Sequence, residues 1–249
     1  MTNAIGIDPL SGVSLSLECS CQGANIHSGT GFVVSYDGLN YLITNWHVVT
    51  GRNPYTDQAF SNRGVPDTIG IWYHSTKRLG LWILKTEPLF DSTTRTPKWR
   101  EHPNGKEIDV VALPLTRYED VNVYPLDLSL AKTDLIISPS EPVSIIGFPF
   151  GMAASGKFPI WKTGHVASDI VLDYDGKPLF LIDATTKPGM SGSPVVAKRI
   201  GLHRTSTGWV MKFGEIIRFL GIYSGSIYEP SDVGMVWKPE VLNDILPYS

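Results

Sequence analysis

Short apolar runs, broken by glycine and proline, recur from one end of this 249-residue chain to the other. The 24 glycines and 18 prolines stand between these runs, where a helical protein would show long stretches with a 3.6-residue apolar period. Each half also contains an Asp-Gly hairpin signal, Asp37-Gly38 in the first and Asp175-Gly176 in the second. This punctuation predicts an all-β protein.

The apolar runs form two sets of about six strands, separated by a polar stretch from Thr116 to Ser140. The predicted strands are 13–21, 30–35, 40–44, 67–74, 80–87 and 107–114, then 143–148, 158–167, 178–184, 193–197, 217–224 and 234–238. We therefore expect two packed six-stranded antiparallel β-barrels in a single unit spanning 1–249. The predicted parts are an N-terminal barrel (12–125), a C-terminal barrel (140–238) and a short closing helix (239–247) that starts at Pro239.

Charge and hydropathy narrow the range of partners. The chain has 21 Lys and Arg against 24 Asp and Glu, and no basic run is longer than Lys198-Arg199, so a nucleic-acid partner is not expected. No apolar run approaches the roughly 20 residues of a membrane span, and the first residues lack the features of a signal peptide. We expect a cytoplasmic protein with no membrane partner and no cofactor, and the oligomeric state stays open.

The two cysteines, Cys19 and Cys21, lie two residues apart on one predicted strand and point to the same face. A disulfide between them would be strained, and a metal site needs more ligands. We expect two structural thiols, since free cysteine behaves as a small hydrophobe.

The hexapeptide Gly189-Met190-Ser191-Gly192-Ser193-Pro194 carries the clearest chemical signal. A serine between glycines can present its hydroxyl on a tight turn beside backbone N–H groups, as a nucleophile with an oxyanion hole requires. An ordinary loop between two strands has the same composition, so other segments must decide whether Ser191 is a nucleophile.

Two further segments supply a base and an acid. His47 follows the apolar strand that ends at Thr44, at the point where the chain turns. Asp109 leads into the apolar run Val110 to Leu113, and a buried carboxylate requires a donor such as an imidazole N–H. Glu107, two residues earlier, is the competing carboxylate.

Taken together, these segments resemble the trypsin-like serine peptidases, and most closely the bacterial branch with the Deg-type proteases and the staphylococcal glutamyl endopeptidases. The segments with matching order and spacing are Ser28 to Val33, Tyr41 to Val49, Asp109 to Leu113, Ile146 to Gly151, Lys162 to Val166, Asp183 to Pro194 and Val233 to Pro239. The order His47, Asp109, Ser191 also differs from that of the α/β-hydrolases.

The resemblance implies a serine endopeptidase with a polypeptide substrate. His47 would take the proton of Ser191, Asp109 would orient His47, and the backbone N–H groups of Gly189 and Ser191 would form the oxyanion hole. An alternative is a non-catalytic module on the same fold that binds peptides or proteins. Met190 departs from the animal digestive enzymes, which carry an aspartate there, so activation by a new N-terminus is not expected.

The family pattern also places a substrate pocket. Thr185 would lie at its floor and Ser224, Gly225 and Ser226 would form its wall, which predicts cleavage after small or medium uncharged residues. Residues 198–216 would then be an insertion. In a second register of the sequence against the family pattern, the strand from Gly201 to His203 would line the pocket instead. His203 would then favour cleavage after acidic residues.

Overall fold

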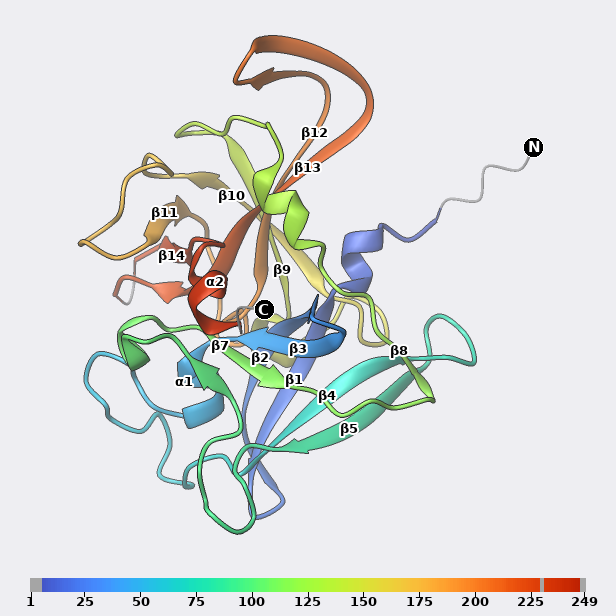
Figure 1. Ribbon diagram of the computed structural model, residues 1–249, viewed down its shortest axis with the longest axis vertical. Coiled ribbons are helices and arrows are strands. Elements are labelled where there is room, and N and C mark those ends of the chain that lie inside the picture. The colour runs from blue at the N-terminus through green and yellow to red at the C-terminus, as the bar shows by residue number, and fades with distance from the viewer. Residues whose placement is uncertain (1–5, 229–230, 247–249) are drawn as a thin grey trace.

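The computed structural model describes residues 6–228 and 231–246 (Figure 1). Its first sheet has eight antiparallel strands, in the order β5-β4-β1-β2-β3-β7-β6 with β8 paired to β4. Their bounds are β1 (Ser14–Cys21), β2 (Ala24–Tyr36), β3 (Leu39–Thr44), β4 (Thr68–Ser75), β5 (Trp82–Pro88), β6 (Arg100–Glu101), β7 (Val111–Pro114) and β8 (Val121–Asn122). Two of the eight, β6 and β8, are short strands that the sequence analysis did not predict.

The second sheet closes into a barrel in the order β10-β11-β14-β13-β12-β9. Its strands are β9 (Pro142–Gly147), β10 (Ile160–Val166), β11 (Leu179–Asp183), β12 (Pro194–Thr205), β13 (Gly208–Ser226) and β14 (Val233–Trp237). The chain is thus an all-β protein of two sheets with six or more strands each, as predicted.

Helices are few and short. The α-helices are α1 (Trp46–Thr50) and α2 (Val241–Ile245), and the 3-10 turns are η1 (Pro9–Gly12), η2 (Gly105–Glu107), η3 (Leu128–Lys132) and η4 (Pro149–Gly151). Helix α2 lies inside the predicted closing segment, whose residue 247 is outside the described residues. No helix in the described part of the chain is long and apolar enough to span a membrane.

The predicted strand at 107–114 is shorter in the structure. Residues Gly105–Glu107 form η2, and the strand β7 begins only at Val111. Asp109 therefore lies on the link between them, where Val110 N donates to Ile108 O at 2.7 Å, and its side chain is free of the alternation that a strand imposes.

Three buried clusters make the core. One fills the first sheet, one fills the closed barrel, and the third joins the two with residues from both sheets and from α2. In this joining cluster Phe32 of β2 meets Phe219 of β13 edge to face, with 5.7 Å between ring centroids. The inward side chains of alternate strand positions supply these contacts, as Leu15 and Leu17 do in β1.

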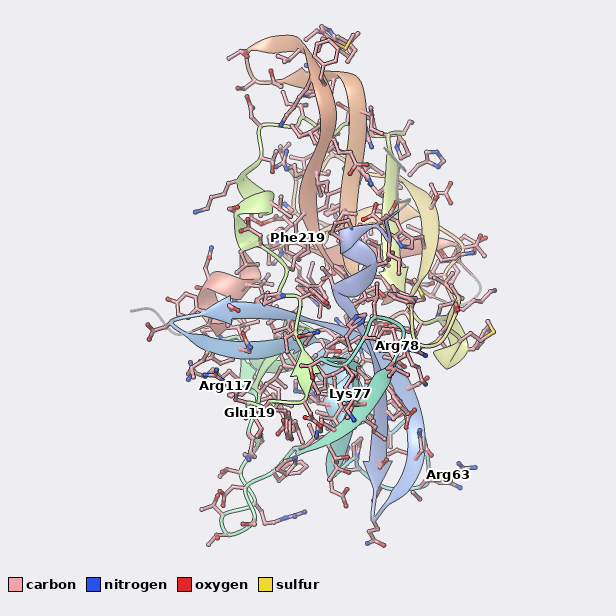
Figure 2. All side chains as sticks on the ribbon, turned by 90° about the vertical axis from the view of Figure 1, so that its right-hand side faces the viewer. Arg63, Lys77, Arg78, Arg117, Glu119 and Phe219 are labelled. Carbon is pink, nitrogen blue, oxygen red and sulfur yellow. The ribbon has the colours of Figure 1, made fainter. Side chains whose placement is uncertain are left out.

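Strands β12 and β13 continue far beyond the barrel as one hairpin, which projects from the molecule in two perpendicular views (Figures 1 and 2). It covers the predicted insertion, residues 198–216, and we call these residues the arm. The pairing of β12 with β9 ends at Val196, so the arm has left the barrel.

Candidate active site

His47 lies in the first turn of α1, directly after strand β3. Its backbone N donates to Asp109 Oδ1 at 2.9 Å, and its Nδ1 lies 2.6 Å from Asp109 Oδ2. Because an ionised carboxylate only accepts hydrogen bonds, Nδ1 is the protonated ring nitrogen in this pair and Nε2 is left with a lone pair. The α1 helix ends at Gly51, whose φ of 66° suits glycine.

Asp109 is 2% exposed, yet its carboxylate is well supplied with donors. Besides His47, Ser224 donates its Oγ to Asp109 Oδ2 at 2.5 Å. The Asn45 Nδ2 donates to the Asp109 backbone O at 2.6 Å and so holds the link in place. These contacts offset the cost of burying the charge. Glu107 is exposed on η2 and forms no described contact with His47.

Ser191 lies on the tight turn that precedes β12. Its Oγ donates to the backbone O of Ser224 at 3.1 Å, and its own backbone O accepts from Thr30 N at 2.9 Å. Gly192, with a φ of 87°, allows this approach, since a Cβ there would lie 2.0 Å from Thr30 O. The structure thus joins Ser191, Ser224, Asp109 and His47 in one chain of hydrogen bonds, although no described bond links Ser191 directly to His47.

Ser224 has a role here that the sequence analysis did not assign. It was expected only as a wall of the pocket, yet its O and Oγ connect Ser191 to Asp109. The available signal was a serine at the end of the apolar run Phe219 to Tyr223, because a buried hydroxyl needs a partner.

The backbone before Ser191 is held by three hydrogen bonds. Pro188 O accepts from Phe150 N at 2.6 Å, Gly189 O accepts from Thr30 Oγ1 at 2.7 Å, and Met190 O accepts from Ser193 N at 3.0 Å. In a trans peptide the N–H and the C=O point in opposite directions. The Gly189 N–H therefore points away from Pro188 O, and the Ser191 N–H points away from Met190 O. Neither N–H has a hydrogen-bond acceptor among the described residues.

Glycine is required at position 189. Its φ is 94°, and a Cβ there would lie 2.5 Å from Phe148 O. The neighbouring Met190 side chain is fully buried in the cluster that fills the second barrel. Apolar packing and the three hydrogen bonds therefore hold this loop without an ion pair.

Around the predicted pocket the structure adds Tyr223. Thr185 itself is exposed, whereas the hydroxyl of Thr186 is hydrogen-bonded to the Tyr223 hydroxyl. The Tyr223 ring is buried against Gly234 of β14, where a Cβ would lie 2.7 Å from the ring. Tyr223 thus lies between Thr186 on one side and β14, at Gly234, on the other.

The second register is not supported by the positions of its residues. His203 is buried on the arm, pairs with Val210 and contacts the backbone O of Gly201. The strand that lies beside Ser191 is the end of β13, which carries Ser224.

A second histidine lies close to His47. His27 Nε2 is 2.7 Å from the backbone O of Val48. Burial lowers the pKa of His27, the hydrogen bond to Val48 O opposes this in part, and the nearby His47 ring adds to the lowering, so His27 is neutral near pH 7. Among the described residues no cluster of His, Cys, Asp and Glu side chains is suited to a metal ion.

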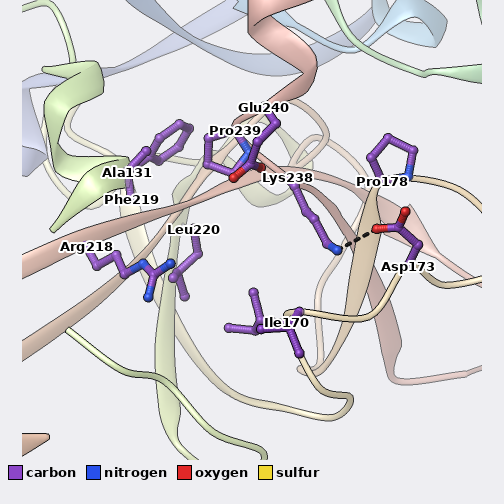
Figure 3. A pocket seen from close by; sticks show the side chains of 11 residues that line it. Ala131, Ile170, Asp173, Pro178, Arg218, Phe219, Leu220, Lys238, Pro239 and Glu240 are labelled. Atoms are coloured by element: carbon purple, nitrogen blue, oxygen red, sulfur yellow. Dashed lines mark hydrogen bonds and ion pairs between the residues drawn. The ribbon is translucent and has the colours of Figure 1, made fainter. Parts of the chain in front are cut away.

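Two cavities lie away from this hydrogen-bonded chain. One, of about 400 Å³, is lined by Ile170, Leu220 and the ion pair between Lys238 Nζ and Asp173 Oδ1 at 2.6 Å (Figure 3). The other, of about 630 Å³, lies under the N-terminal segment beside Tyr124 and Phe158. Neither contains a predicted site residue.

Comparison with known proteins identifies the family and supports the fold. Residues 29–201 match the family described as "Trypsin-like peptidase domain". Solved structures with a similar fold include the Rv3671c protease from M. tuberculosis in its active form, with a TM-score of 0.51 and 16% identity over 96% of this chain and 83% of that one. A serine endoprotease from Yersinia pestis has a TM-score of 0.52 and 14% identity over 96% of this chain and 65% of that one. No curated protein matches the chain.

Proposed function

Because this chain belongs to the trypsin-like peptidase family, we propose that it is a serine endopeptidase whose nucleophile is Ser191. The observation that carries the proposal is the chain of hydrogen bonds from His47 through the buried Asp109 and Ser224 to Ser191. Acyl transfer requires a base that a third group orients, as Asp109 orients His47, and Ser224 connects the same carboxylate to the proposed nucleophile.

The proposed reaction begins with proton transfer. His47 Nε2 accepts the proton of Ser191 Oγ as that oxygen attacks the substrate carbonyl, and Asp109 stabilises the imidazolium that forms. The carbonyl oxygen becomes an oxyanion, which accepts hydrogen bonds from the N–H groups of Gly189 and Ser191. Each such donor lowers the barrier by about 3 kcal/mol. His47 then protonates the leaving amine, and water cleaves the acyl-enzyme in a second, similar step.

The geometry around Tyr223 supports a shallow specificity pocket. Its hydroxyl is hydrogen-bonded to Thr186, next to the predicted floor residue Thr185, and its ring lies against Gly234. We propose that the pocket bounded by Thr185, Ser224, Gly225 and Ser226 takes small or medium uncharged side chains. The motifs of the sequence also lead us to propose a place in the bacterial branch with the Deg-type proteases, and a cytoplasmic location.

A fluorophosphonate probe tests the nucleophile, because it reacts with an activated serine and not with an ordinary one. Peptide mass mapping should find the label on Ser191. Labelling should vanish in Ser191→Ala and His47→Ala, and Asp109→Asn should lower the rate by about 10⁴-fold. Glu107→Gln is the matched control and should label at the parent rate.

The result separates the two functions that the sequence left open. Well-folded protein that takes no label but retains a peptide would support the non-catalytic binding module. Loss of labelling in Glu107→Gln with a near-normal rate in Asp109→Asn would show that the wrong carboxylate had been assigned.

A further inference from the structure

The arm has two unlike faces. Residues directly opposite in a β-ladder share a face, and the pairs are Leu202 with Met211, Arg204 with Trp209, and His203 with Val210. On the face with His203, the side chains of β12 are buried, at His203 and Thr205, whereas Val210 of β13 is 40% exposed. The face with Met211 and Trp209 is open.

Apart from Arg204 near the tip, the large side chains of the open face are apolar. Five large side chains lie on it or at its base, with exposed fractions of 71% (Ile200), 56% (Leu202), 70% (Trp209), 61% (Met211) and 99% (Phe213). Monomeric proteins rarely expose a contiguous apolar patch of more than a few hundred Å², and larger patches mark interaction sites. A two-stranded hairpin of this kind has no sheet behind it to explain such a face.

We propose that this face binds a second copy of the chain, with the two arms packed face to face and antiparallel about a two-fold axis. The order of residues along the arm supports this occupant. From base to tip the face carries Ile200 and Phe213, then Leu202 and Met211, then Arg204 and Trp209. An axis through the middle pair places the tip of each arm on the base of the other, which is the self-complementary match that a two-fold interface needs.

The charges also match in this arrangement. The Arg204 side chain is exposed and forms no ion pair or hydrogen bond among the described residues. At the base of the arm Glu215 lies opposite Ile200, and its carboxylate is 45% exposed although it accepts from Lys198. This packing sets β12 over β12 and β13 over β13, so Trp209 of one copy lies on the Phe213 ring of the second. Arg204 then lies over Ile200, one strand away from Glu215 of the second copy, where its charge is favourable.

The area is sufficient for a stable contact. Fully buried aromatic side chains cover roughly 150–250 Å² each, and the aliphatic ones about 60–120 Å². At the exposed fractions above, the five side chains offer on the order of 550 Å² per copy. Two copies together reach roughly 1,100 Å², and a specific interface needs about 1,000 Å² in total.

Single cysteines test the proposed axis in the intact protein. Met211→Cys lies beside the axis, and facing sheets lie about 10 Å apart, beyond the reach of a direct disulfide. A short bis-maleimide should therefore join two copies, seen as a doubled mass on a denaturing gel. Val210→Cys is the matched control, exposed on the opposite face of the same strand, and should not cross-link. The parent protein, with Cys19 and Cys21 alone, is the blank.

Sedimentation equilibrium supplies the second measurement. The parent protein should be a dimer at about 10 μM, and Trp209→Ser with Phe213→Ser should weaken association at least about 100-fold with an unchanged melting temperature. Val171→Ser with Leu172→Ser removes two exposed apolar residues elsewhere and should leave the dimer intact. A monomeric parent, a dimer insensitive to the arm variants, or equal cross-linking by Val210→Cys would overturn the proposal. Arm-dependent binding of the monomer to lipid vesicles would overturn it in favour of a membrane.

Discussion

Thr30→Val is the substitution that best tests how the loop before Ser191 is held. Thr30 is fully buried in β2, in the first sheet, whereas the loop belongs to the second. Its hydroxyl donates to Gly189 O at 2.7 Å and accepts from Phe148 N at 3.1 Å. Valine has nearly the same shape as threonine but removes both bonds at once.

The expected loss of stability follows from the two backbone groups that lose their partner, Gly189 O and Phe148 N. Each is left buried without a hydrogen bond, at a cost of about 1–3 kcal/mol. A total of about 3 kcal/mol would lower the Tm of a chain this long by roughly 6–12 °C. Because the released Gly189 carbonyl shares its residue with a proposed oxyanion donor, the rate of fluorophosphonate labelling should also fall by at least about tenfold.

Thermal unfolding and labelling kinetics, measured side by side, provide the assay. Thr30→Ser is the matched control, since it keeps the hydroxyl and loses one methyl group, at a cost of about 1 kcal/mol and with a near-parent labelling rate. A Thr30→Val protein that melts within about 1 °C of the parent and labels at the parent rate would refute the reasoning. Equal losses in the serine and valine variants would show that the methyl group matters and the hydroxyl does not.

Two further predictions concern Tyr223 and the cysteines. Tyr223→Val should deepen the pocket, so that in a peptide library cleavage after leucine or phenylalanine rises at least about tenfold relative to cleavage after alanine. An unchanged preference would show that Tyr223 does not limit the pocket. Burial raises the pKa of the Cys19 thiol to about 12 and its Sγ contacts Val48 O, whereas Cys21 is only half-buried, so iodoacetamide at pH 8 should modify Cys21 alone in native protein. Modification of Cys19 at a similar rate, read by peptide mass mapping, would contradict this.

Local pattern determined most of the fold. Each of the twelve predicted strands overlaps a strand of the structure, because alternation of apolar side chains and Asp-Gly turns act within a few residues. Residues 29–201, which match the peptidase family, include most of these strands. The start of β7 was missed because Ile108 and Val110 extend the apolar pattern of the strand into the link that carries Asp109.

Tertiary structure alone decided how the candidate site is connected. The bond from Ser224 to Asp109 joins residues 115 apart in the chain, and the bond from Thr30 to Gly189 joins residues 159 apart. No local spacing encodes such pairs, since they exist only after two separately folded sheets pack on each other. The arm shows the same division: the sequence marks residues 198–216 as an insertion, and only the register of β12 against β13 shows that Leu202, Met211 and Trp209 share one open face.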